Sequence, residues 1–524
     1  MCAGDFPFDA ADGFPPDPRL TPRDDAVLLA AAAARVAAAV CGAPPPPSAA
    51  ALGRLASRPV YGAFVSLKRG KQLRSCCGYL GESLELAHAL DHAAVRAACD
   101  DPRFPPIGRD ELHELRIEVW VLWGFRPVPQ RGPARAAAVE IGRHGAQISS
   151  AEGRGLLLPG VAVEHGFDAA GFLDAVCHKA GLPARAWLDD DTKLFVFEGR
   201  SAAAPLSRFV AARTPVWAGR FYPGDRRAIE AALDRWQAAA TFRPAPWLAA
   251  VVPHAGWPYS GRLAFETLAQ IDFPPQTIIF CPRHTGIGPR WAVWPGAQWE
   301  VPGATIAADP MLAARLAAEI DGLMLDDAPH REEHAIEVLL PMIARLAPHT
   351  RVVGITVGMI ALEELIRFGD QLAEVVAALP QRPLLLVSSD MHHRASDAET
   401  RRLDELALKE LEAADPQGLY RAVIEHGITM CGAPAAVIVL EALRRLNAAA
   451  PLHGQLAERS GPAGEAPDEA AFRVPQSRSE GAIECRRVGH TTSAEASGDW
   501  SNCVGYAGLL YGPAPSAKTE PPRP

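Results

Sequence analysis

The chain has 524 residues, of which 48% are hydrophobic and 22% charged, and its formal net charge is −9 at pH 7. This length predicts roughly two to four domains, and the acidic balance argues against a general nucleic-acid binder, because such proteins usually carry a basic surface. The ten cysteines form no Cys-x2-Cys pair, and we find neither a signal peptide nor an apolar run long enough to span a bilayer, so we expect a cytoplasmic protein with reduced thiols and no membrane partner.

The first half of the chain, 24–200, has the pattern of an α+β domain. Residues 1–23 are rich in Pro and Asp and are expected to be disordered. A run dominated by alanine and leucine then predicts a helix, which the Pro44–Pro47 run ends. Alternation of apolar and polar residues predicts half-buried strands. The expected elements are helices at 24–41 and Ser83–Cys99 and strands at Val60–Leu67 and Leu115–Leu122.

The second half, 215–512, alternates short apolar strands with longer helical stretches. That alternation predicts an α/β domain with a largely parallel sheet covered by helices. A linker near 201–214 separates the halves, the polar segment 456–480 is expected to be a flexible insertion, and residues 513–524 are expected to be disordered. The expected strands are Trp247–Val252, Thr277–Cys281, Val352–Val357 and Leu384–Val387, and the expected helices are Pro310–Ile320, Glu332–Leu346 and Ala361–Leu379.

Histidine and aspartate side chains follow three of these strands. His254 follows the first strand, His284 the second, and Asp390 and His393 the last. Open α/β sheets bind ligands beyond the carboxyl ends of their strands, and imidazole and carboxylate groups ligate first-row metals. The sequence therefore predicts that these side chains meet at one edge of the sheet, either as a ligand site or as ordinary hydrogen-bonded loop residues.

Two further groups can join this edge. His334 lies near the start of one expected helix, and Cys431 directly precedes a helical run from Ala435. A thiol at a helix N-terminus has a lowered pKa, because the helix dipole favours the thiolate, which is the form that binds metal. Two imidazoles with one thiolate suit copper, iron or zinc. The alternative interpretation of Cys431 is an inert buried small residue.

Seven motifs of the second half resemble, in order and spacing, those of the Memo family. They are AGRFYP (218–223), PHAGWPYSG (253–261), PRHTG (282–286), EEHAIEVLLP (332–341), SSDMHH (388–393), MCG (430–432) and SGDWSNCVGYAG (497–508). The resemblance implies a fold similar to that of the class III extradiol dioxygenases, a non-haem iron group. It also implies site residues at the matching positions: the metal ligands His254, His284 and Cys431, and the catalytic residues Asp390, His393 and His334.

The chain departs from the Memo pattern next to these motifs. Cys281 stands where the family usually has Gly, Ala335 and Leu339 replace Ser and Gln, and Arg283 and His392 replace smaller polar residues. These differences concern substrate preference more than the metal trio. The sequence leaves open whether Cys281 or His392 joins the site.

The first half resembles the AMMECR family over 24–200. The matching motifs are LRSCCGYL (73–80), DPRFPPI (101–107), LRIEVWVL (115–122), GLLLPGVAVEHG (155–166) and CHKAGLP (177–183). The resemblance implies two subdomains with a cleft, in which Arg74 and Cys76 are the candidate cleft residues. By itself, the basic segment Lys68–Gly78 reads as a turn between strands that either holds an anion or is solvated.

The two families are encoded together with a radical-SAM protein in many prokaryotes, as the AmmeMemoRadiSam system. The chain looks like a fusion of the first two parts and has no Cys-x3-Cys-x2-Cys motif, so the resemblance implies a separate radical-SAM partner. Three functional hypotheses follow. In the first, the second half is a metal-dependent oxidoreductase that uses copper or iron (zinc also fits) on a small molecule or peptide. In the second, it is a non-catalytic module that binds such a ligand, while the first half binds an anion. In the third, the whole fusion is a scaffold or substrate for the radical-SAM partner.

Overall fold

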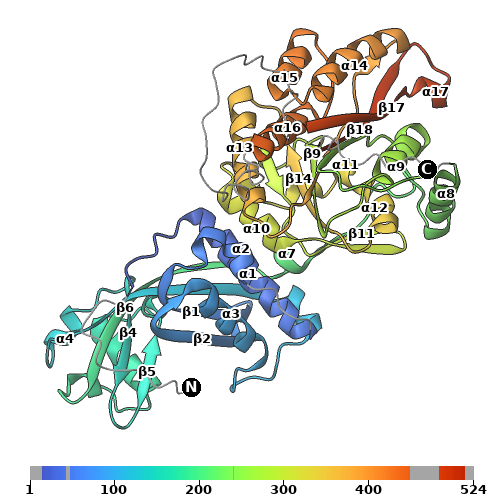
Figure 1. The fold of residues 1–524 in the computed structure, drawn as a ribbon. Coiled ribbons are helices and arrows are strands. Elements are labelled where there is room, and N and C mark those ends of the chain that lie inside the picture. The colour runs from blue at the N-terminus through green and yellow to red at the C-terminus, as the bar shows by residue number, and fades with distance from the viewer. Residues whose placement is uncertain (1–14, 43–47, 240, 449–482, 514–524) are drawn as a thin grey trace, which may run out of the picture. The chain divides into compact units, whose positions relative to one another are not determined.

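The computed structural model describes residues 15–42, 48–239, 241–448 and 483–513 (Figure 1). It divides into two compact units, of which unit 1 runs to Ala212 and also includes 295–297 and 310–318, and unit 2 comprises the remainder. The predicted insertion at 456–480 lies outside the described residues, as do most residues of the two termini predicted to be disordered. Within 1–23, residues 15–23 are described, and helix α1 already begins at Pro22.

Unit 1 is built on a six-stranded sheet with the order β2-β1-β3-β6-β4-β5. Every pairing in this sheet is antiparallel. Its strands are β1 (Pro59–Arg69), β2 (Gln72–Glu85), β3 (Arg116–Pro127), β4 (His144–Ser149), β5 (Arg154–Leu157) and β6 (Lys193–Pro205). Only Gly70 and Lys71 separate β1 from β2, and Gly70 has a left-handed φ of +59°, as tight hairpins require. The basic segment Lys68–Gly78 is therefore strand with a two-residue turn, not the longer turn predicted.

Helices pack on the sheet of unit 1 in two groups. Helices α1 and α3 contact each other, and α3 lies across β1 and β2 (Figure 1). The apolar side chains of α1, such as Val27 and Leu28, are buried. A second core joins α6 to β4 and β6 around Phe172 and Ile148. The helices are α1 (Pro22–Cys41), α2 (Ser48–Leu52), α3 (Leu86–Cys99), α4 (Ala134–Ala137), α5 (Pro159–His165), α6 (Ala169–Lys179) and α7 (Ser207–Val210).

Unit 2 contains a nine-stranded sheet with the order β13-β10-β14-β9-β15-β8-β18-β16, and β17 pairs with β18. The four central strands β14, β9, β15 and β8 are parallel, whereas β10 and β18 run antiparallel to their neighbours in this group. The strands are β8 (Ala249–Val252), β9 (Gln276–Pro282), β10 (Trp291–Val293), β13 (Leu323–Leu325), β14 (Arg351–Val357), β15 (Leu384–Ser388), β16 (His393–Ala395), β17 (Ile483–Thr492) and β18 (Cys503–Pro513), and β11 (Gln298–Val301) pairs with β12 (Ala304–Ala307) outside this sheet.

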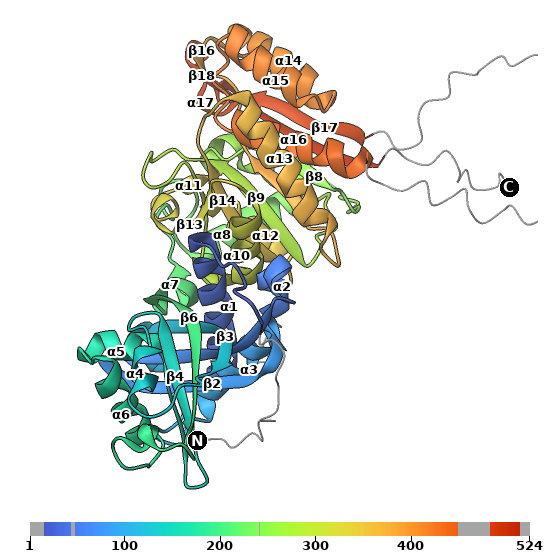
Figure 2. The same ribbon diagram turned by 90° about the vertical axis from the view of Figure 1, so that its left-hand side faces the viewer.

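Successive side chains of a strand point to opposite faces of the sheet, and both faces of the central strands are buried. On β9, Ile279 packs in the core that includes Phe265 of α9, whereas the ring of its neighbour Phe280 meets Phe368 of α13. Figure 2 shows α14 and α15 beside β17 and β18. The helices of unit 2 are α8 (Arg226–Ala238), α9 (Arg262–Leu268), α11 (His334–Glu337), α12 (Leu340–Leu346), α13 (Leu362–Ala377), α14 (Asp397–Glu412), α15 (Pro416–Glu425), α16 (Ala433–Ala448) and α17 (Ala494–Ser497). Helix α10 (Pro310–Glu319) belongs, except for its last residue, to unit 1.

The helix predicted at Glu332–Leu346 is two helices, α11 and α12, and this prediction was wrong. Pro341 lies in the first turn of α12. Its ring clashes with the carbonyl four residues earlier and it has no N–H to donate, so a single continuous helix cannot form. Among the described residues, no helix is long and apolar enough to cross a membrane.

Candidate functional site

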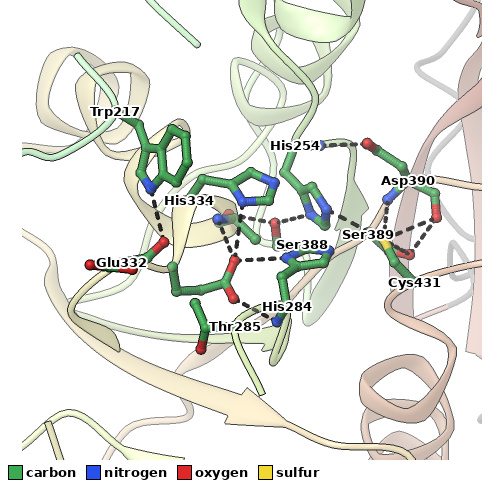
Figure 3. A network of polar contacts seen from close by, with 12 residues as sticks. Trp217, His254, His284, Thr285, Glu332, His334, Ser388, Ser389, Asp390 and Cys431 are labelled. Atoms are coloured by element: carbon green, nitrogen blue, oxygen red, sulfur yellow. Dashed lines mark hydrogen bonds and ion pairs between the residues drawn. The ribbon is translucent and has the colours of Figure 1, made fainter. Parts of the chain in front are cut away.

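His254, His284 and Cys431 meet at the carboxyl ends of the parallel strands (Figure 3). The two histidines follow β8 and β9, which flank β15 on either side, and Cys431 precedes α16. One ligand atom from each of the three residues lies within 4.8 Å of the others. The Nε2 atom of His254 is 3.3 Å from the Sγ atom of Cys431. The structure thus brings together the three side chains predicted as metal ligands.

A buried serine fixes the orientation of the His254 ring. The hydroxyl of Ser388 donates to the carbonyl of Ala335 at 2.6 Å and lies 2.9 Å from Nδ1 of His254. A hydroxyl has a single hydrogen, so toward His254 it accepts, and Nδ1 carries the ring hydrogen. Burial lowers the pKa of His254 well below its ordinary value, so the ring is neutral and Nε2 presents a lone pair to Cys431.

A buried carboxylate orients His284 in the same way. Glu333 is 2% exposed, and its Oε1 lies 2.8 Å from Nδ1 of His284 while its Oε2 accepts the backbone N–H of His284 at 2.8 Å. Burial acts to raise the pKa of Glu333, but the hydrogen bonds from His284 and from the backbone N–H of Ala335, together with the electrostatic effect of His284 and His334, keep the pKa below its ordinary value. An ionised carboxylate only accepts, so Nδ1 of His284 is the donor and Nε2 remains the ligand atom.

The Cys431 thiol is protonated in the metal-free protein, contrary to the sequence-based expectation. Burial, followed by the charge of Asp390, raises its pKa well above the ordinary value. Helix α16 begins only at Ala433, and the dipole effect falls off within the first turn. Desolvation therefore wins over the dipole, and the S–H group donates to Nε2 of His254.

Asp390 lies beside the trio and braces it. Its Oδ1 accepts the backbone N–H groups of His254 at 2.8 Å and Ala255 at 3.2 Å, and its own N–H donates to Sγ of Cys431 at 3.3 Å. Burial raises the pKa of Asp390 to about 7, against the lowering effect of the two backbone donors. Asp390 thus contacts the backbone of His254 through its carboxyl group and the sulfur of Cys431 through its backbone N–H.

His393 lies on the same side of the sheet, at the start of β16. Its Nδ1 is 2.9 Å from the carbonyl of Thr429, which can only accept, so Nδ1 carries a hydrogen and Nε2 is left free to accept. Burial lowers the pKa of His393.

His334 stacks on His284 and closes one side of the cluster. The centroids of the two rings are 4.5 Å apart, and Phe221 and Trp217 contact the His334 ring at 4.6 and 5.8 Å. Its Nδ1 shares Oε1 of Glu333 at 3.4 Å. Burial lowers the pKa of His334 to about 4, so this ring is neutral near pH 7. With Glu333 and His284 it forms a second group of ligand atoms within 4.8 Å of one another.

The trio fits a small metal ion. With metal–nitrogen bonds of about 2.0 Å and metal–sulfur bonds of about 2.3 Å, tetrahedral angles separate N and S ligand atoms by about 3.5 Å. The distance between Nε2 of His254 and Sγ of Cys431 is 3.3 Å, and the whole group spans no more than 4.8 Å. Imidazole and thiolate groups are ligands of copper, zinc and iron.

Neither Cys281 nor His392, which the sequence left open, belongs to a ligand group among the described residues. Cys281 is fully buried on β9 and packs in the apolar core. His392 donates its backbone N–H to Asp404 and accepts the N–H of Thr429 at Nδ1. Both positions contribute to packing rather than to the ligand set.

Sequence reasoning missed two residues that the site depends on, Glu333 and Ser388. Both stand inside the motifs that resemble the Memo family, but the resemblance implied His334, Asp390 and His393 as the residues of the site. A usable signal existed for Ser388, because it directly follows the predicted strand Leu384–Val387 and opens the SSDMHH motif. None existed for choosing Glu333 over its neighbour Glu332, since only the fold shows that one is buried and the other exposed.

The motif residues of unit 1 are engaged with one another. Arg74 bonds both carboxylate oxygens of Glu111 at 2.9 and 3.0 Å and the carbonyls of Pro105 and Pro106 at 2.9 and 3.0 Å. Lys68 pairs with Glu118 at 2.6 Å. Three cations of the basic segment, Lys68, Arg69 and Arg74, are therefore paired with carboxylates of unit 1, which disfavours the anion-binding interpretation.

Cys76 lies on the edge strand β2, where polar side chains bond to its backbone and to its thiol. Asp101 accepts its backbone N–H at 2.8 Å and Arg103 donates to its carbonyl at 2.8 Å, while its thiol accepts a hydrogen bond of 3.1 Å from Ser66. Burial raises the pKa of Cys76, so the group is a thiol. These contacts cap the outward N–H and C=O of edge strand β2, as sheet edges require.

Comparison with known proteins identifies both units. Residues 213–459 match the Memo family, described as Memo-like protein, and residues 29–202 match the AMMECR1 family. A MEMO1 family protein of Aquifex aeolicus is 28% identical over 57% of this chain and 98% of its own length, and a protein of Thermococcus gammatolerans is 40% identical over 28% of this chain and 77% of its own length. The crystal structure of an uncharacterized protein from Pyrococcus horikoshii is 32% identical and covers 34% of this chain and 91% of that one, with a TM-score of 0.32. Both resemblances drawn from the sequence are thereby confirmed, and the chain belongs to two families, with an AMMECR1-family region followed by a Memo-family region.

Proposed function

We propose that unit 2 binds copper or iron through Nε2 of His254, Nε2 of His284 and Sγ of Cys431. The observation that carries this proposal is that both imidazoles have their Nδ1 atoms committed to buried partners, so that both Nε2 atoms are left for a ligand. Second partners of this kind are typical of metal-binding histidines. Zinc also suits this ligand set, and the thiolate favours copper(I) or zinc over harder ions.

We propose that the bound metal supports redox or oxygenase-like chemistry. A metal ion held by three protein ligands supplies an open position for a substrate or for oxygen. Asp390 holds the backbone of His254 in place. His334 and His393 line the surroundings with neutral rings whose Nε2 atoms can accept a proton from a bound molecule.

The arrangement of strands supports a relation to the class III extradiol dioxygenases. Both histidine ligands follow parallel strands of the central sheet, as expected for a site at a sheet edge. In those enzymes a carboxylate completes the two-histidine set, whereas here a cysteine takes that place. A thiolate donates more charge and can itself be oxidised, so the proposed chemistry does not extend to ring cleavage.

The test is a titration of the metal-free protein with copper(I) against a competing chelator. Cys431→Ser should lower copper(I) affinity far more than affinity for harder ions, because a neutral hydroxyl is a poor ligand for copper(I). Cys41→Ser, which removes an exposed thiol of unit 1, is the matched control and should leave affinity unchanged. Circular dichroism checks folding. Unchanged copper(I) affinity in folded Cys431→Ser would remove the thiolate from the site.

We also propose a cytoplasmic location and a radical-SAM partner. The described cysteines are all free thiols, which suits a reducing compartment. Co-expression with a radical-SAM protein of the same system tests the second point. A stable complex, or a mass change on the chain, supports the partnership, and neither result in a pair that is expressed and folded would contradict it.

A further inference from the structure

Two exposed histidines lie one helical turn apart on α3 in unit 1. His88 and His92 are four residues apart, so they share one face of the helix. The centroids of their rings are 4.5 Å apart and the rings are inclined by 67°. Two histidines four residues apart on a helix are the arrangement that binds zinc in metalloproteases.

A tyrosine from the adjacent strand restricts one of these rings. Tyr79 of β2 stacks on His92, with centroids 4.4 Å apart and an interplanar angle of 17°, and meets the edge of His88 at 5.3 Å. The stack limits the rotamers of His92, so less side-chain entropy remains to be lost when a ligand binds. Three aromatic side chains from two elements thus form one cluster on the surface of unit 1.

The nitrogens of this cluster are not committed elsewhere. In the part of the chain that the structure describes, no hydrogen bond or ion pair is formed by the side chains of His88, His92 or Tyr79. The nearest charged groups on the helix have other partners, because Asp91 pairs with Arg35 at 3.0 Å and Arg96 donates to the carbonyl of Gly78 at 3.2 Å. On an exposed helix face, oppositely charged residues at i and i+4 often pair. On this face of α3, the two positions four residues apart are the histidines His88 and His92.

We propose that His88 and His92 form a second metal site, separate from the His254–His284–Cys431 trio, that takes a divalent ion preferring imidazole, namely Zn²⁺, Cu²⁺ or Ni²⁺. Neutral imidazole suits these ions, and water completes the coordination. Tyr79 acts as a packing surface for His92, not as a ligand. With two protein ligands and an exposed position, this site binds its ion more weakly than a three-ligand buried site would.

Equilibrium dialysis with Zn²⁺ tests the proposal on the full-length chain. A His254→Ala, His284→Ala, Cys431→Ser background removes the trio and also breaks the His284–Glu333–His334 group, so that failure of this site and failure of the proposed function are distinguishable. The background protein should bind one Zn²⁺ per chain. His88→Ala and His92→Ala should each weaken binding by more than about tenfold, the loss that even removal of an outer hydrogen-bond partner can cause. His178→Ala, at an exposed histidine on α6, should have no effect.

Two further variants separate the parts played by the three rings. Tyr79→Phe should keep the affinity, since the stack survives, whereas Tyr79→Ala should lower it. If the background does not fold, His88→Ala should lower the zinc stoichiometry of the otherwise unaltered chain by one. A chain that binds no Zn²⁺ outside the trio, or binding that His88→Ala leaves intact, would overturn the proposal.

Discussion

In unit 1 the polar residues of the family motifs bond to one another, whereas in unit 2 they leave ligand atoms unused. Arg74 has each of its donor nitrogens on Glu111 or on a backbone carbonyl. In contrast, His254 and His284 each use Nδ1 for a buried partner and direct Nε2 toward other ligands.

The difference lies in the chemistry of the side chains. A guanidinium and a carboxylate have matching donors and acceptors, so a pair of them satisfies itself and braces the chain. Two imidazoles whose Nδ1 hydrogens are already used have Nε2 left as the atom that can bind a cation. The same kind of motif therefore contributes to the architecture of one unit and to the proposed binding site of the other.

The largest effect is expected within unit 2, at a polar residue that is architectural. Glu337 forms a buried ion pair with Arg213 and accepts from the backbone of Trp217 and the hydroxyl of Tyr222. Glu337→Ala should lower the free energy of unfolding by about 3–5 kcal/mol, because it leaves a buried arginine without its partner. Urea denaturation measures this, with exposed Glu332→Ala as the control. A loss no larger than that of the control would contradict this interpretation.

The corresponding brace in unit 1 is Asp101, which is 6% exposed. It accepts from the side chain of Arg103 and the backbone of Cys76. Asp101→Ala should destabilise unit 1 by about 2–3 kcal/mol, the range for buried hydrogen bonds to a charged group. The unfolding transition of unit 1 should shift while metal affinity of unit 2 stays constant. The exposed neighbour Asp100 supplies the control, and loss of metal in Asp101→Ala would break the comparison between the units.

The same carboxylate gives unit 1 a defined pH dependence. Burial acts to raise the pKa of Asp101, but hydrogen bonds from Arg103 and Cys76 outweigh it and hold the pKa well below its usual value of 3.8. A depressed carboxyl pKa contributes stability that is complete above the ordinary value and disappears as the pH falls toward the folded-state value. The stability difference between wild type and Asp101→Asn should be constant from about pH 7 to 5 and shrink below about pH 4. A difference that grows on acidification would show the opposite sign.

Metal affinity should respond to Glu333, although this residue is not a proposed ligand. Glu333→Gln removes a charge and one acceptor from His284, and affinity for copper(I) should fall by about 10–100-fold, as is usual when an outer partner of a metal-binding histidine is lost. Competitive chelator titration measures this. Glu332→Gln changes an exposed neighbour and should leave affinity unchanged. Equal affinities for both variants would mean that the orientation of His284 does not matter.

The smallest effect is expected at Arg74. Its side chain is 15% exposed and that of its partner Glu111 is 21% exposed, so solvent screens the pair only in part. Arg74→Ala should cost about 1 kcal/mol of stability in unit 1, with metal content unchanged, whereas Lys71→Ala in the hairpin turn should cost nothing measurable. Thermal unfolding with both variants checks the order. If Arg74→Ala were as neutral as Lys71→Ala, the brace assigned to this ion pair would be wrong.

The sequence by itself determined the two-part organisation and the course of the main strands. Apolar alternation placed β1 and β3, and short apolar runs placed β9, β14 and β15, because burial of a strand face depends on the period of the local sequence. The motifs also determined the candidate site residues at the strand ends. Local patterns missed the break at Pro341, although the sequence contained the signal for it.

Only the tertiary structure decided the protonation states and hydrogen-bond partners of these candidate residues. His254 and Ser388 are 134 positions apart, and the hydrogen bond between them fixes which ring nitrogen is free. Burial, not the dipole of α16, determines that the Cys431 thiol is protonated. Arg74 belongs to a brace because Glu111 lies 37 positions away in sequence and within 2.9 Å in space. Protonation and hydrogen-bond partners depend on desolvation and on distances between remote segments, and these are properties of the packed chain rather than of any stretch of it.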